Sequence, residues 1–403
     1  MKNIFSWVNF TGTIVVLAFM WLLGSIVVQF DFLNVFEEVL EDYNLTDVYY
    51  TKIRNNDAVS FEDRIVLVNI GDAARGRGSI AQEIAILNKY NPKVIAIDAK
   101  FLGLKEEDPM GDFQLATAIQ EAENFILASE FKVTSDTSTG WDTLYTPPPL
   151  FKNDAHTAYV NVGNLEFGEQ TKNNQKEPCF PVKIAELYDK EAAEKFLARG
   201  NEIENIYFKG NLEKFSKLDV EDVLNENFIP ELIKDKIVIM GYMGDHYTDY
   251  YFDEDKFYTP LNEKQVGRGT PDMFGVVVHA NIVSMILDEN YIYEMAPYLG
   301  YIFAIVICFL NVALFSAILR NKKWAPYYGL TKLIQLIEVL IILTISIFSF
   351  ALFNYKVDLT LAFLVIILDG DITEIYIDII LVSLIKVAFL KKFSLKTNSL
   401  NVS

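Results

Sequence analysis

The chain alternates between long apolar runs and one long stretch in which polar and apolar residues are mixed. Residues 10–30 contain no charge, and 296–319 form a second charge-free run. A third run, 333–353, has Glu338 as its only charge. At about 1.5 Å per residue, each run is long enough to cross the ~30 Å hydrocarbon layer of a bilayer. The pattern predicts three transmembrane helices, the first of them an uncleaved signal-anchor.

A fourth transmembrane helix is predicted over 359–390, where the apolar pattern is interrupted by carboxylates. At about 100° per residue, Asp371, Glu374 and Asp378 fall on one stripe of this helix. Asp369 points the other way. Each ionised carboxylate near the bilayer centre costs about 2.5–3.5 kcal/mol. We therefore expect the stripe to face other helices, to be protonated, or to contact a partner subunit.

Two further charges in the apolar runs lie at similar depth. Glu338 is five residues inside the start of its run, and Lys386 is five residues before the basic end at Lys391. Intramembrane charges usually pair with one another. We expect Glu338 and Lys386 to form an ion pair, which a charge swap at both positions would preserve.

The short connector 320–332 sets the predicted orientation. It carries four basic residues and no acid, which places it in the cytoplasm. Four crossings then leave both ends, 1–9 and 391–403, in the cytoplasm. Residues 31–295 face outward, which in a bacterium means the periplasm, so the expected location is the bacterial inner membrane.

The outward stretch is acidic and long enough to bury one core. Residues 31–296 hold 25 of the 35 Lys and Arg residues and 48 of the 54 Asp and Glu residues, so their formal charge is 25 − 48 = −23. This charge argues against nucleic acid as a partner. The two cysteines, Cys179 and Cys308, fall in the domain and in a membrane run, so no intrachain disulfide is expected. Thirteen residues follow Leu390, too few for a catalytic module.

The first half of the outward stretch alternates between β-branched runs and helical patterns. Strands are expected at 64–70, 93–98 and 125–131, with helices at 79–90 and 112–123 between them. This order predicts parallel pairing through right-handed crossovers. Ligands of such sheets bind outside the carboxyl ends of the strands, where Asp72 and Asp98 lie.

The second half is less regular. Strands are expected at 157–162 and 203–208 on either side of a helix at 182–199, then a buried strand at 236–240 and a helix at 279–290. We expect the sheet to become mixed here. The predicted fold class is an α/β extracytoplasmic domain with a mixed, partly parallel sheet, plus four transmembrane α-helices.

The Gly-rich loop 71–79 sits where a phosphate cradle could form at a helix N-terminus. It lacks the strict dinucleotide fingerprint, and no Gly-Lys-Ser/Thr follows. Ser79 and Gln82 instead match a capping box. A structural turn and helix cap is the favoured interpretation.

The acidic loop 245–255 offers oxygen ligands and one imidazole, so calcium or a transition metal was considered. Its spacing does not follow an EF-hand, and we favour a solvated loop with no metal. His279 and Asn281, at the start of the predicted last helix, have two open interpretations: ligand contacts, or caps that satisfy buried backbone. With three histidines and no hydrolase signature, neither catalytic residues nor a cofactor is predicted.

Several segments, taken in order, resemble the second type of CHASE domain, the cyclase/histidine-kinase-associated sensory extracellular domain of bacteria. The matching segments are RIVLVNIGD at 64–72, NPKVIAIDAKF at 91–101, HTAYVNVGN at 156–164, IPELIKDKIVIMGYMGD at 229–245, YTPL at 258–261 and GVVVHANIVSMIL at 275–287. The resemblance covers 59–295. It extends to the architecture, because this family places three membrane helices directly after the domain.

The resemblance implies a sensory function. Members of the family usually continue into a cytoplasmic cyclase, kinase or phosphatase-linked output, and this chain departs from that pattern. Crevice position and the family motifs together select the candidate ligand-binding residues Asp72, Asp98, Asp249, Thr259, His279 and Asn281.

The leading hypothesis is a sensor that binds a small ligand or a periplasmic protein and signals through its membrane helices to a separate partner protein. A structural or assembly component of an envelope complex is the alternative. An ion- or proton-coupled membrane device that uses the carboxylates of 359–390 is the third. A homo-oligomer is compatible with all three.

Overall fold

The computed structural model describes most of the chain. The described residues are 4–27, 45–72, 76–132, 143–161, 170–172, 175–201, 203–244, 246, 255–262, 270–324, 327 and 329–383. The chain divides into two compact units. The globular unit comprises 50–292, and the helical unit comprises 1–49 together with 293–403.

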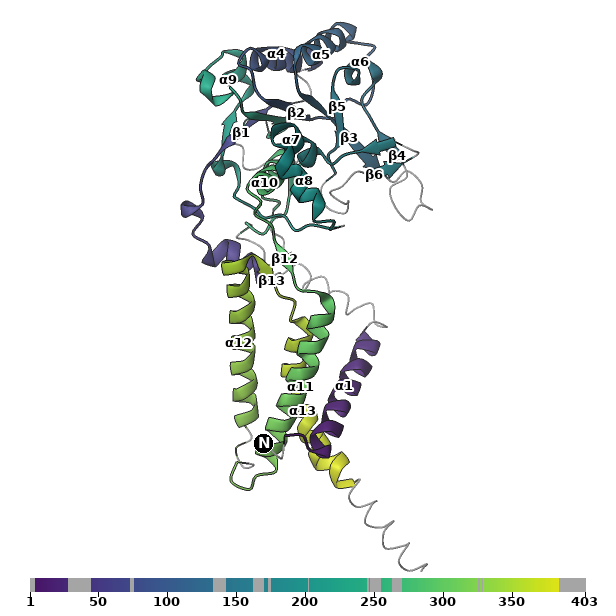
Figure 1. Cartoon of the computed structure of the whole chain (residues 1–403), viewed down its shortest axis with the longest axis vertical. Coiled ribbons are helices and arrows are strands. Elements are labelled where there is room, and N and C mark those ends of the chain that lie inside the picture. Colours follow the sequence, from purple (N-terminus) through teal and green to yellow (C-terminus); the bar gives the residue numbers. More distant parts are fainter. Residues whose placement is uncertain are drawn as a thin grey trace, which may run out of the picture. The chain divides into compact units, whose positions relative to one another are not determined.

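A parallel sheet organises the globular unit (Figure 1). Its parallel strands are β1 (Glu62–Asn69), β2 (Val94–Asp98), β3 (Phe125–Lys132), β5 (His156–Tyr159), β8 (Phe215–Leu218) and β9 (Ile237–Gly241). They lie in the order β5-β3-β2-β9-β1-β8. A short strand, β4 (Thr143–Tyr145), extends β3 in the antiparallel direction. The expected mixed, partly parallel sheet is confirmed.

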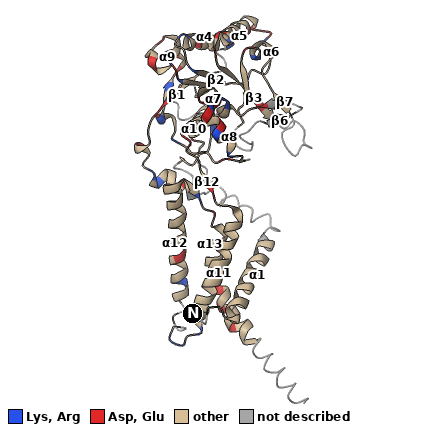
Figure 2. Cartoon of the chain, viewed as in Figure 1, with Lys and Arg blue, Asp and Glu red and all other residues tan. Residues whose placement is uncertain are grey.

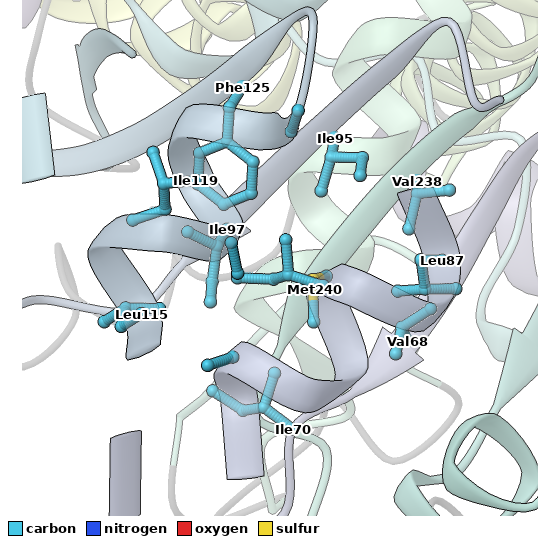
Figure 3. Close-up of a cluster of buried hydrophobic side chains, with 14 of the residues drawn as sticks. Val68, Ile70, Leu87, Ile95, Ile97, Leu115, Ile119, Phe125, Val238 and Met240 are labelled. Carbon is cyan, nitrogen blue, oxygen red and sulfur yellow. The ribbon is translucent and has the colours of Figure 1, made fainter. Parts of the chain in front are cut away.

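Helices cover both faces of this sheet (Figure 1). α4 (Gly76–Asn88) and α5 (Pro109–Glu121) pack against one face, and α7 (Phe180–Tyr188) and α10 (Gly275–Leu287) pack against the other. Alternate strand residues therefore meet two different apolar layers, which explains why the strands are almost continuously hydrophobic. Figure 3 shows the layer beneath α4 and α5, where Ile97 and Met240 lie among helix side chains.

The helix that follows the Gly-rich loop begins earlier than predicted. α4 begins at Gly76, so Ser79 lies within its first turn and the predicted capping box is wrong. Arg77 is buried and forms an ion pair with Asp112 of α5. Its guanidinium also donates to the Gly103 carbonyl at 2.6 Å. A buried tertiary ion pair thus ties the first turn of α4 to α5, and local sequence patterns do not reveal it.

The segment 203–208 is irregular, so the strand predicted there is wrong. Side chains bind its backbone in place of a neighbouring strand. The Tyr207 N–H donates to Met285 Sδ at 3.3 Å, and the Phe208 N–H donates to the Tyr50 hydroxyl at 3.3 Å. The strand that pairs with β1 at this edge is β8.

The helix predicted over 182–199 is divided into two. Asp189 ends α7 and caps α8 (Lys190–Ala198), because its carboxylate accepts from the Ala192 N–H at 3.2 Å. Aspartate favours such cap positions over helix interiors.

In the helical unit, three helices are long and apolar enough to cross a membrane: α1 (Trp7–Val27), α11 (Pro297–Leu319) and α12 (Leu330–Phe353). Figure 2 shows few charged residues along these helices. α13 (Thr360–Ile375) is shorter and continues as a π-helical turn, Tyr376–Leu381. It does not meet the same criterion, so the predicted count of four spans is not confirmed within the described residues.

The acidic residues of α13 and the turn after it occupy two different environments. Asp369 is fully buried. Asp371 and Asp378 are exposed and Glu374 is half-buried, which agrees with the predicted stripe. Asp371 pairs with Lys332 of α12 at 2.6 Å. Asp371 therefore contacts another helix of this chain, the first of the expected alternatives, whereas Asp378 is exposed.

Glu338 of α12 has a neutral partner among the described residues. The Asn311 amide of α11 donates to Glu338 Oε2 at 3.0 Å. Lys386 lies outside the described residues, so the Glu338–Lys386 pair stays a prediction.

Candidate functional site

The site lies where three neighbouring strands end at one edge of the sheet. Asn69 of β1, Gly241 of β9 and Asp98 of β2 are register neighbours there. A Cβ on Gly241 would lie 2.9 Å from Val276 Cβ and 3.6 Å from Asp98 Cβ. Only glycine allows α10 to approach the sheet this closely, so Gly241 brings the first turns of α10 beside Asp98.

Asp98 is a carboxylate with little access to water. Only 14% of its side-chain surface is exposed. Burial raises the pKa of Asp98 to about 7, Lys100 opposes this rise, and the negative charge of Glu130 adds to it. A carboxylic acid that titrates near neutral pH is poised to exchange a proton or a positively charged group.

His279, one turn into α10, lies against Asp98 without forming a full hydrogen bond. Its Nε2 is 3.6 Å from Asp98 Oδ2, and its ring meets Phe180 edge-on at a centroid distance of 5.1 Å. In the described part of the chain, His279 Nδ1 has no hydrogen-bond partner. Burial lowers the pKa of His279 to about 4, although the Val160 backbone acts in the opposite direction. At neutral pH the imidazole is uncharged and does not compensate Asp98.

Asp255 adds a second carboxylate near the start of α10. Its carbonyl accepts from the Gly275 N–H at 3.0 Å, and its φ of 58° places it in the left-handed region that aspartate tolerates. Its side chain is exposed at the surface, yet local burial and the charge of Asp98 raise the pKa of Asp255 to about 6. The positive end of the α10 helix dipole attracts negative charge at this position.

Two lysines at the rim bind a third acid, Glu130 at the end of β3. Lys100 and Lys132 reach it at 2.9 and 3.0 Å. Burial alone would raise the pKa of Glu130, but these two hydrogen bonds outweigh it and lower the pKa. Among the described residues, no lysine or arginine forms an ion pair with Asp98 or Asp255. The group Asp98, Lys100, Glu130, Asp255 and His279, here called the acid cluster, therefore has an excess of negative charge.

The predicted ligand residues separate into three groups in the structure. Asp98 and His279 lie together in the acid cluster. Asp72 follows β1 and is exposed. Asp249 lies outside the described residues. Thr259 and Asn281 are buried and bound to the protein itself.

Thr259 and Asn281 form hydrogen bonds that tie neighbouring segments of the chain together. The Thr259 hydroxyl donates to Asp272 Oδ2 at 2.6 Å. The side-chain Oδ1 of Asn281 accepts from the Lys209 N–H at 2.7 Å and the Gly210 N–H at 3.2 Å. Its side-chain Nδ2 donates to the Gly210 carbonyl at 2.9 Å. Of the two interpretations left open for Asn281, its contacts favour the one in which it satisfies buried backbone.

A second charged group, here called the ion-pair cluster, lies at the other end of α10. Glu62 of β1 has 1% of its side chain exposed and accepts hydrogen bonds from Arg64, Lys209 and Ser284 at 2.5–2.7 Å. Burial opposes ionisation, yet these bonds lower the pKa of Glu62 to about 2. Asp288, just after α10, pairs with both Arg64 and Lys209. This cluster joins β1 to the end of α10.

The chemistry of the acid cluster limits what it can do. Within the described residues no three His, Cys, Asp or Glu side chains are arranged to hold a metal ion, and most of the acidic loop 245–255 lies outside them. The cluster contains neither a hydroxyl nor a thiol nucleophile. Its two uncompensated carboxylates beside a neutral imidazole suit the binding of a positively charged group or a proton.

Sequence reasoning named Asp98 and His279 but gave no role to Lys100 or Glu130. A positional signal existed, because Lys100 lies just past the end of β2 and Glu130 lies in the last residues of β3. In the sequence, Asp255 stands out only as part of the acidic loop 245–255. The ion-pair cluster was missed altogether, because Glu62, Lys209 and Ser284 are far apart in the sequence and none lies in a motif.

Comparison with known proteins gives one family. The model of the CHASE2 domain matches residues 13–315, a wider range than the 59–295 expected from the motifs. CHASE2 domains are sensory extracellular domains. No curated protein and no solved structure gives a significant match.

Proposed function

The chain belongs to the CHASE2 domain family, and we propose that it is a sensor of the bacterial inner membrane whose periplasmic globular unit binds a small positively charged ligand. The acid cluster is the binding site. Occupancy is passed through the membrane helices to a separate partner protein. The observation that carries this proposal is the Asp98 carboxylate, which is buried beside an uncharged His279 and is paired with no lysine or arginine among the described residues.

Physical chemistry supports a cationic ligand at this site. Burying a carboxylate without a counter-charge is unfavourable, so a bound cation would stabilise the ionised form of Asp98. The same relief comes from a proton, which competes with the ligand. Binding is therefore expected to weaken as the pH falls through the pKa of Asp98, which is about 7.

α10 offers a direct path for the signal. His279 lies in its first half, and its last turn contributes Ser284 to the ion-pair cluster. Residues 288–296 connect its end to α11, the membrane helix that follows. A change at the acid cluster that shifts α10 would alter the segment that enters α11.

A separate partner is supported by the exposed acids of the helical unit. Asp378 is exposed on an apolar helix, and Asp371 is exposed apart from its pair with Lys332. Carboxylates at membrane depth are costly against lipid. A partner helix with basic or hydrogen-bonding side chains would compensate them.

Binding is tested by calorimetry on the full chain in lipid nanodiscs, with a panel of small amines and guanidines at pH 8. We expect at least one compound to bind, Asp98→Asn to weaken it at least tenfold, and the exposed-site control Glu226→Gln to leave its affinity unchanged. A wild-type protein that binds no member of the panel, or equal affinities in the Asp98 variant, would contradict the proposal.

Orientation is tested with single cysteines in intact spheroplasts. Both native cysteines are buried, so the background labelling is low. Glu121→Cys on the exposed end of α5 should react with a membrane-impermeant maleimide, and Lys322→Cys in the basic connector should not. The reverse pattern would place the globular unit in the cytoplasm.

One observation favours the second candidate function, an assembly component of an envelope complex. Four large apolar side chains are exposed on the loop before α5 and on its first turns: Leu102, Leu104, Met110 and Phe113. Clustered exposed apolar residues mark interaction surfaces more often than chance. Cross-linking in cells from Phe113 to an envelope protein, together with a failure of the calorimetric panel, would favour this function over sensing.

A further inference from the structure

Asp369 is a buried carboxylate in the helical unit, and it is separate from the acid cluster of the globular unit. It has no exposed surface. Its Oδ1 accepts from the Thr373 hydroxyl at 3.0 Å, one turn along the same helix. Its Oδ2 is buried without a hydrogen-bond partner among the described residues. An ionised carboxylate in this position would leave half of its charge unsatisfied.

Polar side chains from two other helices surround this position. From α11, the Asn311 amide donates to Glu338 of α12, and Asn311 is itself buried. Glu338 is close enough to act electrostatically on Asp369. Two acids from different helices therefore lie near one another, Asp369 buried and Glu338 half-buried. The hydrogen bonds described for them come from the neutral groups Asn311 and Thr373.

The contact between α12 and α13 is close at this level. Gln335, one turn before Glu338, donates to the Ile367 carbonyl at 3.2 Å. A Cβ on Gly370 would lie 2.9 Å from the Gln335 amide, so a larger residue there would displace the Gln335 side chain. This contact lies one residue along α13 from the buried Asp369.

No cation compensates the two acids within the described residues. Lys332, the lysine of α12 that reaches α13, pairs with exposed Asp371. The other titratable groups that face this region are neutral when protonated: Cys308 of α11, and Tyr376, whose hydroxyl bonds Thr11 of α1. The charge of the pair is therefore set by protons alone.

We propose that Asp369 and Glu338 form a proton-binding site in the core of the helical unit, which holds one proton between the two carboxyl groups at neutral pH. A proton on Asp369 turns the unpartnered oxygen into a donor and leaves one negative charge where there would be two. Glu338 is half-buried, so it provides the route by which this proton exchanges with the surroundings. Loss of the proton would place two like charges between α12 and α13 and weaken their contact.

The test is infrared difference spectroscopy of the carboxyl C=O stretch, on the full chain in nanodiscs at pH 7 in H2O and D2O. The wild-type minus Asp369→Asn difference removes contributions from the acid cluster. It should contain a protonated-carboxyl band that shifts in D2O. The matched difference for Asp371→Asn should contain none. Absence of the band from the Asp369 difference would overturn the proposal.

Chemical labelling keeps the test decisive if the Asp369 variant does not fold. A hydrophobic carbodiimide adds to protonated carboxyl groups, and mass spectrometry locates the adduct on the wild-type chain. We expect adducts on Asp369 or Glu338 and at least tenfold less on Asp371. Equal labelling of all three, or no labelling of the pair, would contradict a shared proton.

A comparison with and without sodium distinguishes a bound proton from a bound metal cation. Labelling is repeated at one pH in sodium chloride and in choline chloride of equal ionic strength. Equal adduct yields support proton binding. Protection by sodium alone would show that the site holds a sodium ion in place of the proposed proton.

Discussion

The two ends of α10 bury carboxylates with opposite outcomes. At the ion-pair cluster, Glu62 is more deeply buried than Asp98, yet its pKa falls to about 2 because Arg64, Lys209 and Ser284 donate to it. At the acid cluster, the nearest ring is an uncharged His279, and the pKa of Asp98 rises to about 7.

The difference shows that burial alone does not identify a functional acid. A buried carboxylate with its cations and hydrogen-bond donors already in place stabilises the fold and has no capacity for a ligand. A buried carboxylate without them destabilises the fold and gains from a ligand. The same helix thus joins a structural end to a candidate binding end.

The largest expected effect is at Glu62. Replacing Glu62→Gln leaves Lys209 and Arg64 without their main partner, and should lower the free energy of unfolding of the globular unit by about 3–5 kcal/mol. Labelling of buried Cys179 by a thiol reagent in a urea series of the full chain in detergent measures this change. The exposed control Glu226→Gln should leave the urea midpoint unchanged. Equal midpoints for the Glu62 variant and wild type would show that the cluster is not structural.

The pH dependence of this effect has a defined sign. Because the folded pKa of Glu62 lies at about 2, below its ordinary value of 4.5, its contribution is present above pH 4.5 and is lost as the pH falls toward 2. The difference in the free energy of unfolding between the wild type and the Glu62 variant should therefore become smaller as the pH falls from 4.5 toward 2.

Asp98 should give the next largest effect, with the opposite sign. Its folded pKa is raised from 3.8 to about 7, so its stability contribution is full below pH 3.8 and is lost as the pH rises through 7. Replacing Asp98→Asn removes this loss and should raise the free energy of unfolding at pH 8, on the order of 2–4 kcal/mol. The same urea assay at pH 4 should show almost no difference. If Asp98→Asn were less stable than the wild type at pH 8, Asp98 could not be a carboxylate that lacks a compensating charge.

The smallest effect is expected at Gly241, where a substitution tests whether α10 needs its close approach to the sheet. A Cβ there would meet Val276 at 2.9 Å and push α10 away from the sheet. Replacing Gly241→Ala should cost about 1–3 kcal/mol in the urea assay. It should also weaken ligand binding, because His279 moves with α10. Unchanged stability would mean that α10 does not need this close approach.

The sequence was sufficient for the centre of the sheet and insufficient for its edges. The strands β1, β2, β3 and β9 each contain a run of apolar residues, which is typical of buried parallel strands. At the edge, 203–208 has a similar apolar pattern, but its backbone is bound by Tyr50 and Met285, which no local pattern encodes.

The candidate site could be predicted only in part, again because local patterns do not encode contacts between distant residues. Asp98 and His279 lie beside a strand end and a helix start, which sequence patterns locate. Lys100, Glu130 and Asp255 acquire their roles only through the distances between them. The helical unit repeats this lesson, because helical periodicity separated Asp369 from the exposed stripe but did not reveal Asn311 and Glu338 as its neighbours.

The most direct test of the account asks whether the charge state of Asp98 is felt along α10. Hydrogen–deuterium exchange of the full chain in nanodiscs at pH 8 would compare the wild type with Asp98→Asn, which imitates a neutralised, occupied site. We predict slower exchange in Gly275–Leu287 and in the connecting residues 288–296, with no change in Glu226→Gln. A change confined to the neighbourhood of Asp98, with α10 and the connector unaltered, would contradict the account.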